Sequence, residues 1–368
     1  MKKKLHKLVP KRLRRRQKGL VVQENVPRIT NETVAENREA VLKSARKYIY
    51  PLQHSKHRIV TISTGLFIIT IIAFFAYCTL ALYRFQTNST FLYRVTQVIP
   101  FPIARTGGHF IAYENYLFEL RHYKHYYETQ LKVNFDTGKD KEQLEQFKRR
   151  ALDKVINDAY IKQLAEANGI TVSDREVDDQ ITIVRNQNRL GSTERVFEDV
   201  IRDYWGWSIN DFKRSLQSTI LAQKVVAKLD TEANQKAEAA LAELKSGADF
   251  AAVAMKYSDG PYQANGGEIG FPVDRTSKEV AAQATDALFR TQTGQLTEII
   301  NTGFTLEIYK NLETNGDKIR SARIVVTFKN IDDFVNDFKD KQTYTRYVKL
   351  PEAPAAENPT IPEETSAQ

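Results

Sequence analysis

Histidine and cysteine are scarce in this chain of 368 residues, which has one cysteine, Cys78, and no histidine after His125. A single cysteine cannot form an intrachain disulfide, so the folded part must be stabilised by a packed core. Nucleophilic catalysis by a Ser–His or Cys–His pair is excluded for residues 126–368, because they include neither residue type. His122 and His125 lie three residues apart, but with only His109 nearby we expect no metal site and no cofactor.

Basic charge is concentrated at the N-terminus. Residues 1–58 contain 17 Lys and Arg and 4 Asp and Glu, a net charge of +13; the whole chain carries +9, so the remainder carries −4. Such a tail can act as a topology signal, contact anionic phospholipid or bind nucleic acid. The first twenty residues contain no aromatic side chain that could stack on bases, so we expect no nucleic-acid partner.

The longest uncharged run is "IVTISTGLFIITIIAFFAYCTLALY", residues 59–83. It can cross the roughly 30 Å hydrocarbon core of a bilayer with some tilt. The apolar core of a signal peptide is shorter and stands nearer the start of a chain. We therefore predict a retained transmembrane helix at 59–83. The basic excess before it predicts that residues 1–58 are cytoplasmic and that the C-terminal part is extracytoplasmic, as in a single-pass protein of the cell membrane.

Beyond the apolar run, residues 84–100 resemble a short stalk, and residues 101–230 have the apolar spacing of a helical module. Gly107 and Gly108 predict a turn between a short strand and a helix that begins near Tyr113.

Several helix ends in this module are marked by capping residues. Asn168 and Gly169 predict the C-terminus of one helix. Ser173 and Glu176 have the spacing of a capping box at the start of the next, and Ser208 is the expected N-cap of the last helix.

The composition changes after Asp230. Ala-rich helical segments broken at residues 246–247 are followed by "MKYSDGPYQANGGEIGF", which has too many glycines to continue a helix, and then by a predicted helix at 278–289. Alternating apolar and polar residues around Asn315–Gly316 predict a β-hairpin. We divide this part into a small domain at 231–330, a closing helix at 331–350 and a disordered tail, rich in Pro, Glu and Ala, at 351–368.

Two stretches resemble known families. The segments "LAELKSGADFAAVAMKYSDG", "NGGEIGF" and "TGQLTEIINTGFTLEIYK" resemble the parvulin-type (rotamase, PpiC) peptidyl-prolyl cis-trans isomerases. The module before them, with "INDAYIKQLAEANGITVSDREV", is similar to the N-terminal chaperone domain of the SurA and PrsA class of membrane-associated bacterial foldases. The resemblance implies partners that are unfolded or exported polypeptides.

The resemblance also implies a site that grips a proline ring. Rotation about an X–Pro bond has a barrier of about 18–20 kcal/mol, and its catalysis needs an apolar cup and polar groups that favour the twisted amide. The glycines are needed for a tight turn whatever the function of the domain. The resemblance implies that this turn places Ile269 in the wall of the cup. The substrate-binding positions implied by the resemblance are Gly266, Gly267, Ile269, Gly270, Phe271, Ser277, Ala281 and Phe304.

The chain departs from the family at the catalytic positions. Active parvulins usually carry two facing histidines, one on the first strand of the sheet and one on the last, where this chain has Arg323 and Thr305. Gly260 stands where the family often has Cys or Asp, and Ser277 and Ala281 would make the cup shallow. No catalytic residue is therefore predicted with confidence, and the degenerate positions are Asp259, Gly260, Thr302, Thr305 and Arg323.

The first parvulin strand is missing from its usual place before the helix near Thr231. A similar strand, "IRSARIVV" at 319–326, follows the last strand instead, which suggests either a circular permutation or the start of a truncated second repeat. Under the permutation, Arg323 and Thr305 must share one face of the sheet. A two-residue Asn315–Gly316 turn would put them on opposite faces. We therefore predict an odd-length or bulged turn at 314–316, with Gly316 at positive φ and Glu307 opposite Arg323.

The expected fold class is α+β: a single transmembrane helix, a SurA-like helical module and a small parvulin-like domain with an antiparallel-rich sheet flanked by helices. Two functions compete. The first is a membrane-anchored chaperone with weak or lost isomerase activity, and the alternative is an active peptidyl-prolyl cis-trans isomerase that assists folding after export. A nucleic-acid scaffold is a third reading, which the tail composition disfavours.

Overall fold

The computed structural model describes residues 30–49, 52–135, 138–186, 193–342 and 344–350. The chain divides into two compact units, Met1–Ala76 and Tyr77–Gln368. The first twenty residues of the basic tail and the tail expected at 351–368 lie outside the described residues.

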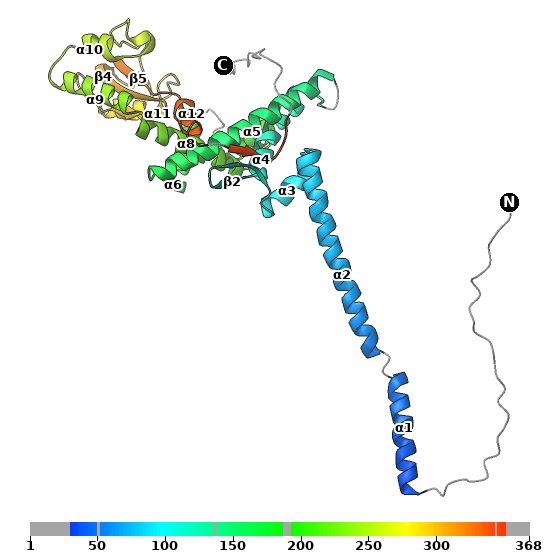
Figure 1. The fold of residues 1–368 in the computed structure, drawn as a ribbon. Helices are drawn as coiled ribbons and strands as arrows, with labels where there is room; N and C mark the ends of the chain where they lie inside the picture. The colour runs from blue at the N-terminus through cyan, green and yellow to red at the C-terminus, as the bar shows by residue number, and fades with distance from the viewer. Residues whose placement is uncertain (1–29, 50–51, 136–137, 187–192, 343, 351–368) are drawn as a thin grey trace, which may run out of the picture. The chain divides into compact units, whose positions relative to one another are not determined.

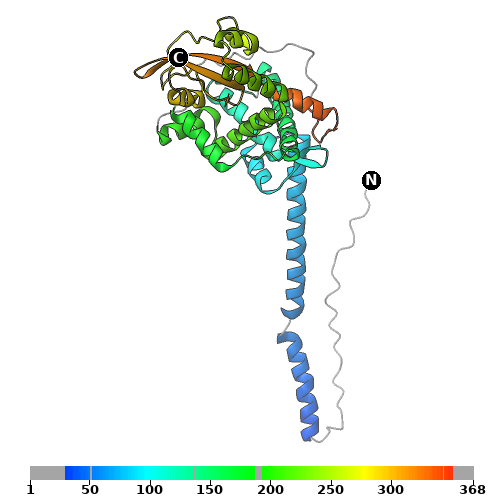
Figure 2. The same cartoon turned by 90° about the vertical axis from the view of Figure 1, so that its left-hand side faces the viewer.

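The described part of the first unit is helical. It contains α1 (Asn31–Ile49) and most of α2 (Leu52–Thr79), each drawn as a continuous helix in Figures 1 and 2. The stretch Arg58–Arg84 is long and apolar enough to cross a membrane by its length and composition, and none of its apolar window is buried by other described residues. Its position agrees with the span predicted at 59–83.

The segment that we expected to be a stalk contains a packed helix. A π-helical turn (Leu80–Arg84) ends the apolar stretch, and α3 (Thr90–Val98) begins after Ser89, whose side chain accepts a hydrogen bond from Leu92 N at 3.3 Å. Leu92 and Thr96 are buried. A helix of nine residues is too short to be stable alone, so its stability comes from packing that local sequence does not reveal.

Among the described residues the helical module contains five longer helices, and two of them start at the predicted caps. The Ser173–Glu176 and Ser208 caps both form, the second as a full capping box with Asp211. Gly169 takes the positive φ, +64°, that was expected at the end of a helix. The helices are α4 (Tyr113–Thr129), α5 (Gly138–Ala167), α6 (Asp174–Asn186), α7 (Glu194–Trp205) and α8 (Ile209–Leu229).

The C-terminal end of the described chain completes this module. β1 (Pro102–Thr106) pairs with β2 (His109–Ala112) around the predicted glycine turn, and β6 (Tyr344–Arg346) pairs with the other edge of β1. α12 (Ile331–Lys339) packs on α5 and α8. The segment 331–350 is therefore a helix followed by a strand, and the module is not confined to residues 101–230.

The second domain is a three-stranded antiparallel sheet between helices. The strand order is β3-β4-β5, and Figure 2 shows the long β4 and β5 side by side in orange. One face, with Leu306 and Ile324, packs on α9 and α10; the other, with Tyr309 and Ile319, packs on Leu288 of α11. The elements are α9 (Thr231–Lys245), α10 (Phe250–Tyr257), a 3-10 turn (Gly260–Tyr262), α11 (Ala282–Arg290), β3 (Ile300–Asn301), β4 (Thr305–Asn315) and β5 (Lys318–Thr327).

α11 begins four residues later than the helix predicted at 278–289. The residues before it form a turn held by Asp274, whose carboxylate accepts hydrogen bonds from Thr276 N at 2.8 Å and from Thr276 Oγ1 at 2.7 Å. Val280 is also fully buried in the core of the sheet's second face. The burial of Val280 keeps the residues up to Ala281 in the loop, so that the helix starts at Ala282.

The hairpin has a different turn from the one predicted, but the predicted face is correct. Asn315 pairs with Lys318 around a two-residue turn, and Gly316 has φ +58°. A bulge between Asn311 and Glu313 then shifts the register, so that Tyr309, and not Glu307, lies opposite Arg323. Because the bulge adds one residue, Thr305 and Arg323 still share one face.

β5 belongs to the same sheet as β4 and is its last strand, covered on its outer edge by the glycine-rich segment. One edge pairs with β4, and the other forms bridges from Ala322 to Glu268 and from Ile319 to Val273 in the glycine-rich segment. The permutation requires this position, since the first and last parvulin strands are antiparallel neighbours.

Gly267 allows the glycine-rich segment to approach β5. It has φ +87°, and a Cβ there would lie 2.7 Å from the carbonyl oxygen of Arg323. We predict that Gly267→Ala lowers the free energy of unfolding by more than the about 1–3 kcal/mol of a strained backbone conformation, because β5 must also move. Denaturant unfolding followed by circular dichroism measures the loss. Gly270→Ala is the matched control, with φ +82° and no atom within 4 Å of its Cβ, and equal losses in the two variants would contradict the packing role.

Candidate functional site

A buried carboxylate organises the sheet face on which histidines were expected. Glu307 is 6% exposed and accepts hydrogen bonds from Thr305 Oγ1 at 2.8 Å and from the hydroxyl of Tyr309. The hydroxyls of Thr302 and Thr305 are hydrogen-bonded to each other at 2.7 Å. Glu307 therefore connects the Thr305 position to the interior of the sheet.

Arg323 provides the positive charge of this network. It is 8% exposed, and its Nη1 lies 3.8 Å from Glu307 Oε2 and donates to the Tyr309 hydroxyl at 3.4 Å. Its Nη2 donates to the Tyr262 hydroxyl, and its guanidinium lies 4.0 Å from the centre of the Tyr262 ring. Its Nε is buried with no hydrogen-bond partner among the described residues.

The network raises the pKa values of two of its members, Arg323 and Tyr309. Burial opposes the charge of Arg323, but the hydrogen bond to Tyr309 and the charge of Glu307 outweigh it and raise the pKa of the guanidinium above its ordinary value. Burial, followed by the charge of Glu307, raises the pKa of Tyr309 well above its usual range. Both shifts favour the protonated forms of Arg323 and Tyr309, so these two groups act as hydrogen-bond donors in the network.

A cleft of about 680 Å³ lies over this face. Arg323 and Glu307 form part of its floor, and α6 and α8 of the helical module form the opposite wall. Phe304, which is 69% exposed, contributes the largest apolar surface on the sheet side. On the helical side the apolar residues are Ile183 and Ile220.

Glycine is required where the two walls meet. Gly303 has φ +97°, and a Cβ there would lie 2.7 Å from the side-chain amide of Gln223 on α8. Amide and hydroxyl groups from Gln180, Gln223 and Thr302 also line the cleft, so hydrogen-bonding groups stand beside its apolar surfaces.

The predicted substrate-binding residues do not all meet in this cleft. Ala281 and Phe304 line it, as do Thr302 and Arg323 from the degenerate catalytic set. Ile269 is buried in the core beside α11, with Phe271 packed against it, so they form no open cup.

The other predicted positions have structural contacts. Ser277 is held in the turn at Asp274, and Gly266 lies close to Ala251 of α10. Asp259 accepts hydrogen bonds from Lys236 Nζ at 2.5 Å and from Thr327 N at 2.8 Å. Gly260 has φ +71° and open space around its Cβ position. Neither Asp259 nor Gly260 lines the cleft.

Comparison with known proteins identifies both parts of the chain. Residues 52–226 match the SurA-like N-terminal domain, and residues 220–313 match the PPIC-type PPIASE domain. The chain combines a SurA-like domain with a rotamase domain. The SurA-like match begins earlier than the predicted boundary at residue 101 and includes the apolar helix.

Similar curated proteins include Chaperone SurA of Methylobacillus flagellatus, which is 27% identical over an alignment of 211 residues. The match covers 46% of this chain and 48% of that protein. The putative peptidyl-prolyl cis-trans isomerase YacD of Bacillus subtilis is 26% identical over 168 residues, 40% of this chain and 57% of that protein. The chain thus spans about half the length of these relatives. A solved structure, foldase protein PrsA of Streptococcus pneumoniae, is 20% identical with a TM-score of 0.21, covering 54% of this chain and 77% of that one.

Part of the candidate site could be predicted from the sequence. Alternation along β4 placed Thr305 and Glu307 on one face, and the permutation hypothesis required Arg323 to share that face. This reasoning gave no signal for Tyr262, which reaches Arg323 from a separate turn. It also could not find the opposite wall of the cleft, because α6 and α8 belong to the SurA-like domain.

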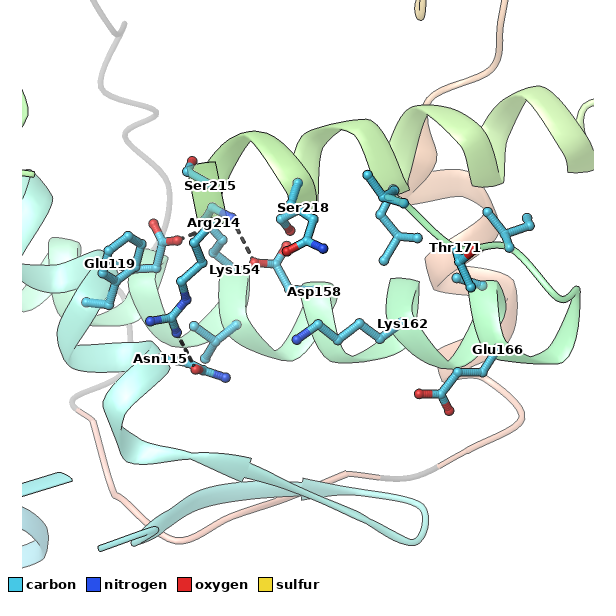
Figure 3. Close-up of a pocket in the computed structure, with 17 residues that line it drawn as sticks. Asn115, Glu119, Lys154, Asp158, Lys162, Glu166, Thr171, Arg214, Ser215 and Ser218 are labelled. Atoms are coloured by element: carbon cyan, nitrogen blue, oxygen red, sulfur yellow. Dashed lines mark hydrogen bonds and ion pairs between the residues drawn. The ribbon is translucent and has the colours of Figure 1, made fainter. Parts of the chain in front are cut away.

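A second cavity, of about 420 Å³, lies within the SurA-like domain between α4, α5 and α8. In Figure 3, Arg214 of α8 reaches Asn115 of α4, and Lys154 reaches Asp158 along α5. This cavity was not predicted from the sequence. The charged side chains Lys154 and Asp158, which line this cavity, form an ion pair with each other.

His122 and His125 are packed residues of the SurA-like domain. The ring of His122 stacks on Trp207 with centroids 4.3 Å apart, and burial lowers its pKa to about 4. His125 Nε2 lies 3.1 Å from the carbonyl oxygen of Asp203. In the part of the chain that the structure describes, no group of three or more His, Cys, Asp or Glu could hold a metal ion.

Removing the Glu307 carboxylate should destabilise the rotamase domain. We predict that Glu307→Gln lowers the free energy of unfolding by about 3–5 kcal/mol, because it leaves the buried Arg323 charge uncompensated. Glu313→Gln is the matched control on the same strand, since its pair with Arg320, 3.8 Å apart, is exposed and should contribute about 0–1 kcal/mol. Urea unfolding of both variants tests this, and similar small losses would show that Glu307 does not offset the arginine charge.

The cap that links α6 to α8 should make stability depend on pH. Hydrogen bonds from Lys224 and then from Ser173 lower the pKa of Glu176 from 4.5 to about 2. A carboxyl group with a depressed folded pKa stabilises the fold fully above its unfolded pKa and loses that contribution as the pH falls through the folded pKa. We therefore predict that Glu176→Gln is less stable than the unchanged protein at neutral pH. The difference should shrink as the pH falls from about 4.5 to about 2, and unfolding curves along that range would refute the linkage if the difference were constant.

Proposed function

We propose that this protein is a membrane-anchored extracytoplasmic chaperone that holds unfolded secreted or envelope polypeptides in the cleft between its SurA-like and rotamase domains, with weak or lost isomerase activity. The observation that carries the proposal is the cleft itself, which is lined by exposed Phe304 and by Ile183 and Ile220, together with the Glu307–Arg323 pair.

The composition of the cleft suits an extended polypeptide. Phe304, Ile183 and Ile220 can bury apolar client side chains, and such burial contributes about 25 cal/mol for each Å² removed from water. Amide and hydroxyl groups along both walls can bond the client backbone, whose polar groups must be satisfied when water is displaced. These groups do not discriminate proline from other residues.

The residues at the floor of the cleft, Glu307 and Arg323, also support the proposal that isomerase activity is weak or lost. A rotamase must bind the twisted amide better than the planar one. At the two histidine positions this chain has Thr305, which bonds Glu307, and Arg323, which is held by Glu307, Tyr309 and Tyr262. Ile269, the expected cup residue, is buried in the core.

The membrane anchor in this proposal is the stretch Arg58–Arg84, which has the length and composition of a membrane span. The net charge of +13 on residues 1–58 favours a cytoplasmic N-terminus by the positive-inside rule, which puts the SurA-like and rotamase domains outside.

The alternative is an active isomerase. It is favoured by one observation: Ala281, Thr302 and Phe304, all implied by the parvulin resemblance, line the same cleft.

Binding without turnover tests the proposal. The protein in vesicles should suppress aggregation of an unfolded client that contains no proline as well as one that contains it. Phe304→Glu should weaken this holding activity by about tenfold or more, because a carboxylate in an apolar contact costs more than about 1.4 kcal/mol. Met255→Glu is the control: Met255 is an exposed apolar residue of α10 that does not line the cleft.

A protease-coupled prolyl isomerisation assay on the same protein separates the two functions. A catalytic efficiency within about a hundredfold of an active parvulin, a difference of only about 2.7 kcal/mol in transition-state stabilisation, would contradict a degenerate site. Strict dependence of holding on proline would also favour the isomerase.

A further inference from the structure

α3 exposes two apolar side chains, of which Val98 also lines a cavity of about 500 Å³ with Ala112, Glu114 and Arg214. Phe91 and Val98 lie seven residues apart, on the same side of the helix, and are 55% and 83% exposed. Arg94 lies between them and is exposed. Leu92 and Thr96 are the residues that α3 buries. An amphipathic helix normally turns its apolar stripe toward the core, and α3 exposes a second one.

The chain reaches α3 directly from the end of the apolar stretch. That stretch ends at Arg84, and Phe85, which is 71% exposed, follows it. Gln86 has φ +49°, and Thr87 N donates to Ala81 O at 2.9 Å, so the chain turns back on the last helical turn before α3 begins at Thr90. Phe85 and the exposed stripe of α3 thus follow the stretch within a few residues.

The end of the apolar stretch is fixed to the same compact unit as α3. Leu82 is fully buried, and its carbonyl accepts a hydrogen bond from the Tyr113 hydroxyl at 2.7 Å. The Tyr83 hydroxyl donates to Pro102 O at 2.5 Å. From the opposite side, Arg121 bonds Thr90 Oγ1 at 3.0 Å and covers the Tyr93 ring of α3. These contacts hold α3 beside the end of the apolar stretch at Leu82–Arg84.

We propose that α3 lies in the interface of a phospholipid bilayer, with Phe85, Phe91 and Val98 at the acyl boundary and Arg84 and Arg94 at the phosphates. The inference rests on the proposed membrane anchor. Helices of this kind, apolar on one side with arginine beside it, lie in the plane of the interface, and a guanidinium can bind phosphate through two hydrogen bonds. The occupant follows from the path of the chain, because the exposed surface begins at Phe85, one residue after Arg84, and continues at Phe91, seven residues after it, a span of chain within reach of the headgroups.

Single fluorescent probes in the full-length protein test this seating. Phe91→Cys and Val98→Cys, each in a Cys78→Ala background and labelled with an environment-sensitive nitrobenzoxadiazole dye, are reconstituted in vesicles of phosphatidylethanolamine and phosphatidylglycerol. Both probes should show blue-shifted emission and be quenched by lipids that carry a nitroxide near the headgroup. Arg175→Cys, at an exposed position on α6, is the control and should report water.

A third probe distinguishes failure of this inference from failure of the anchor. Ile68→Cys lies within the apolar stretch and should be quenched by nitroxides deep in the acyl chains. If that probe is quenched while the probes at 91 and 98 report water, the anchor stands and the seating of α3 is wrong. If the probes at 91 and 98 respond only after an unfolded client is added, the face binds client and the lipid assignment is overturned. A probe at 68 that reports water overturns the anchor and the seating together.

Discussion

The buried carboxylate of Asp230 joins the two points at which the chain crosses between the SurA-like and rotamase domains. Its Oδ1 accepts a hydrogen bond from Ala233 N at 3.1 Å in the first turn of α9, and its Oδ2 accepts one from Lys329 N at 2.7 Å, just after β5. One side chain therefore holds the end of α8, the start of α9 and the exit from the sheet together. The cleft depends on this junction, because Ile220 and Gln223 of α8 can face Gly303 and Phe304 only while the sheet is held beside α8.

The chain enters and leaves the rotamase domain at Asp230 because β5, and not β4, is the last strand of the sheet along the chain. The match to the rotamase family ends at residue 313, before β5, yet β5 pairs with β4 along most of its length and forms bridges to the glycine-rich segment on its other edge. If the first strand preceded α9, the last strand of the domain would be β4, and the chain would leave the sheet at the end of β4. β4 has 11 residues, so at about 3.3 Å per residue its end lies roughly 35 Å from its start. Since β5 runs antiparallel to β4, it returns the chain to the start of β4 and to Asp230. α12 and β6 can then close the SurA-like domain.

Features set by neighbouring residues could be predicted from the sequence, and features set by distant ones could not. The capping boxes at Ser173 and Ser208 depend on residues three positions apart, and both form. The shared face of Thr305 and Arg323 was predicted from the permutation hypothesis, but the bulge before Glu313 that produces it was not, because a bulge depends on the partner strand. α3 was taken for a stalk, since its stability lies in contacts with residues far along the chain.

The Glu307–Arg323 network shows why this site differs from a parvulin site by more than two residues. Glu307 takes hydrogen bonds from Thr305 and Tyr309 and offsets the charge of Arg323, which in turn holds Tyr262. Histidines at positions 305 and 323 would remove the arginine and leave Glu307 buried without a fixed cation, and an uncompensated buried charge costs several kcal/mol. Restoring imidazoles would therefore also require changes at Glu307 and Tyr309. The contacts that occupy the catalytic positions are the same contacts that hold this face of the sheet together.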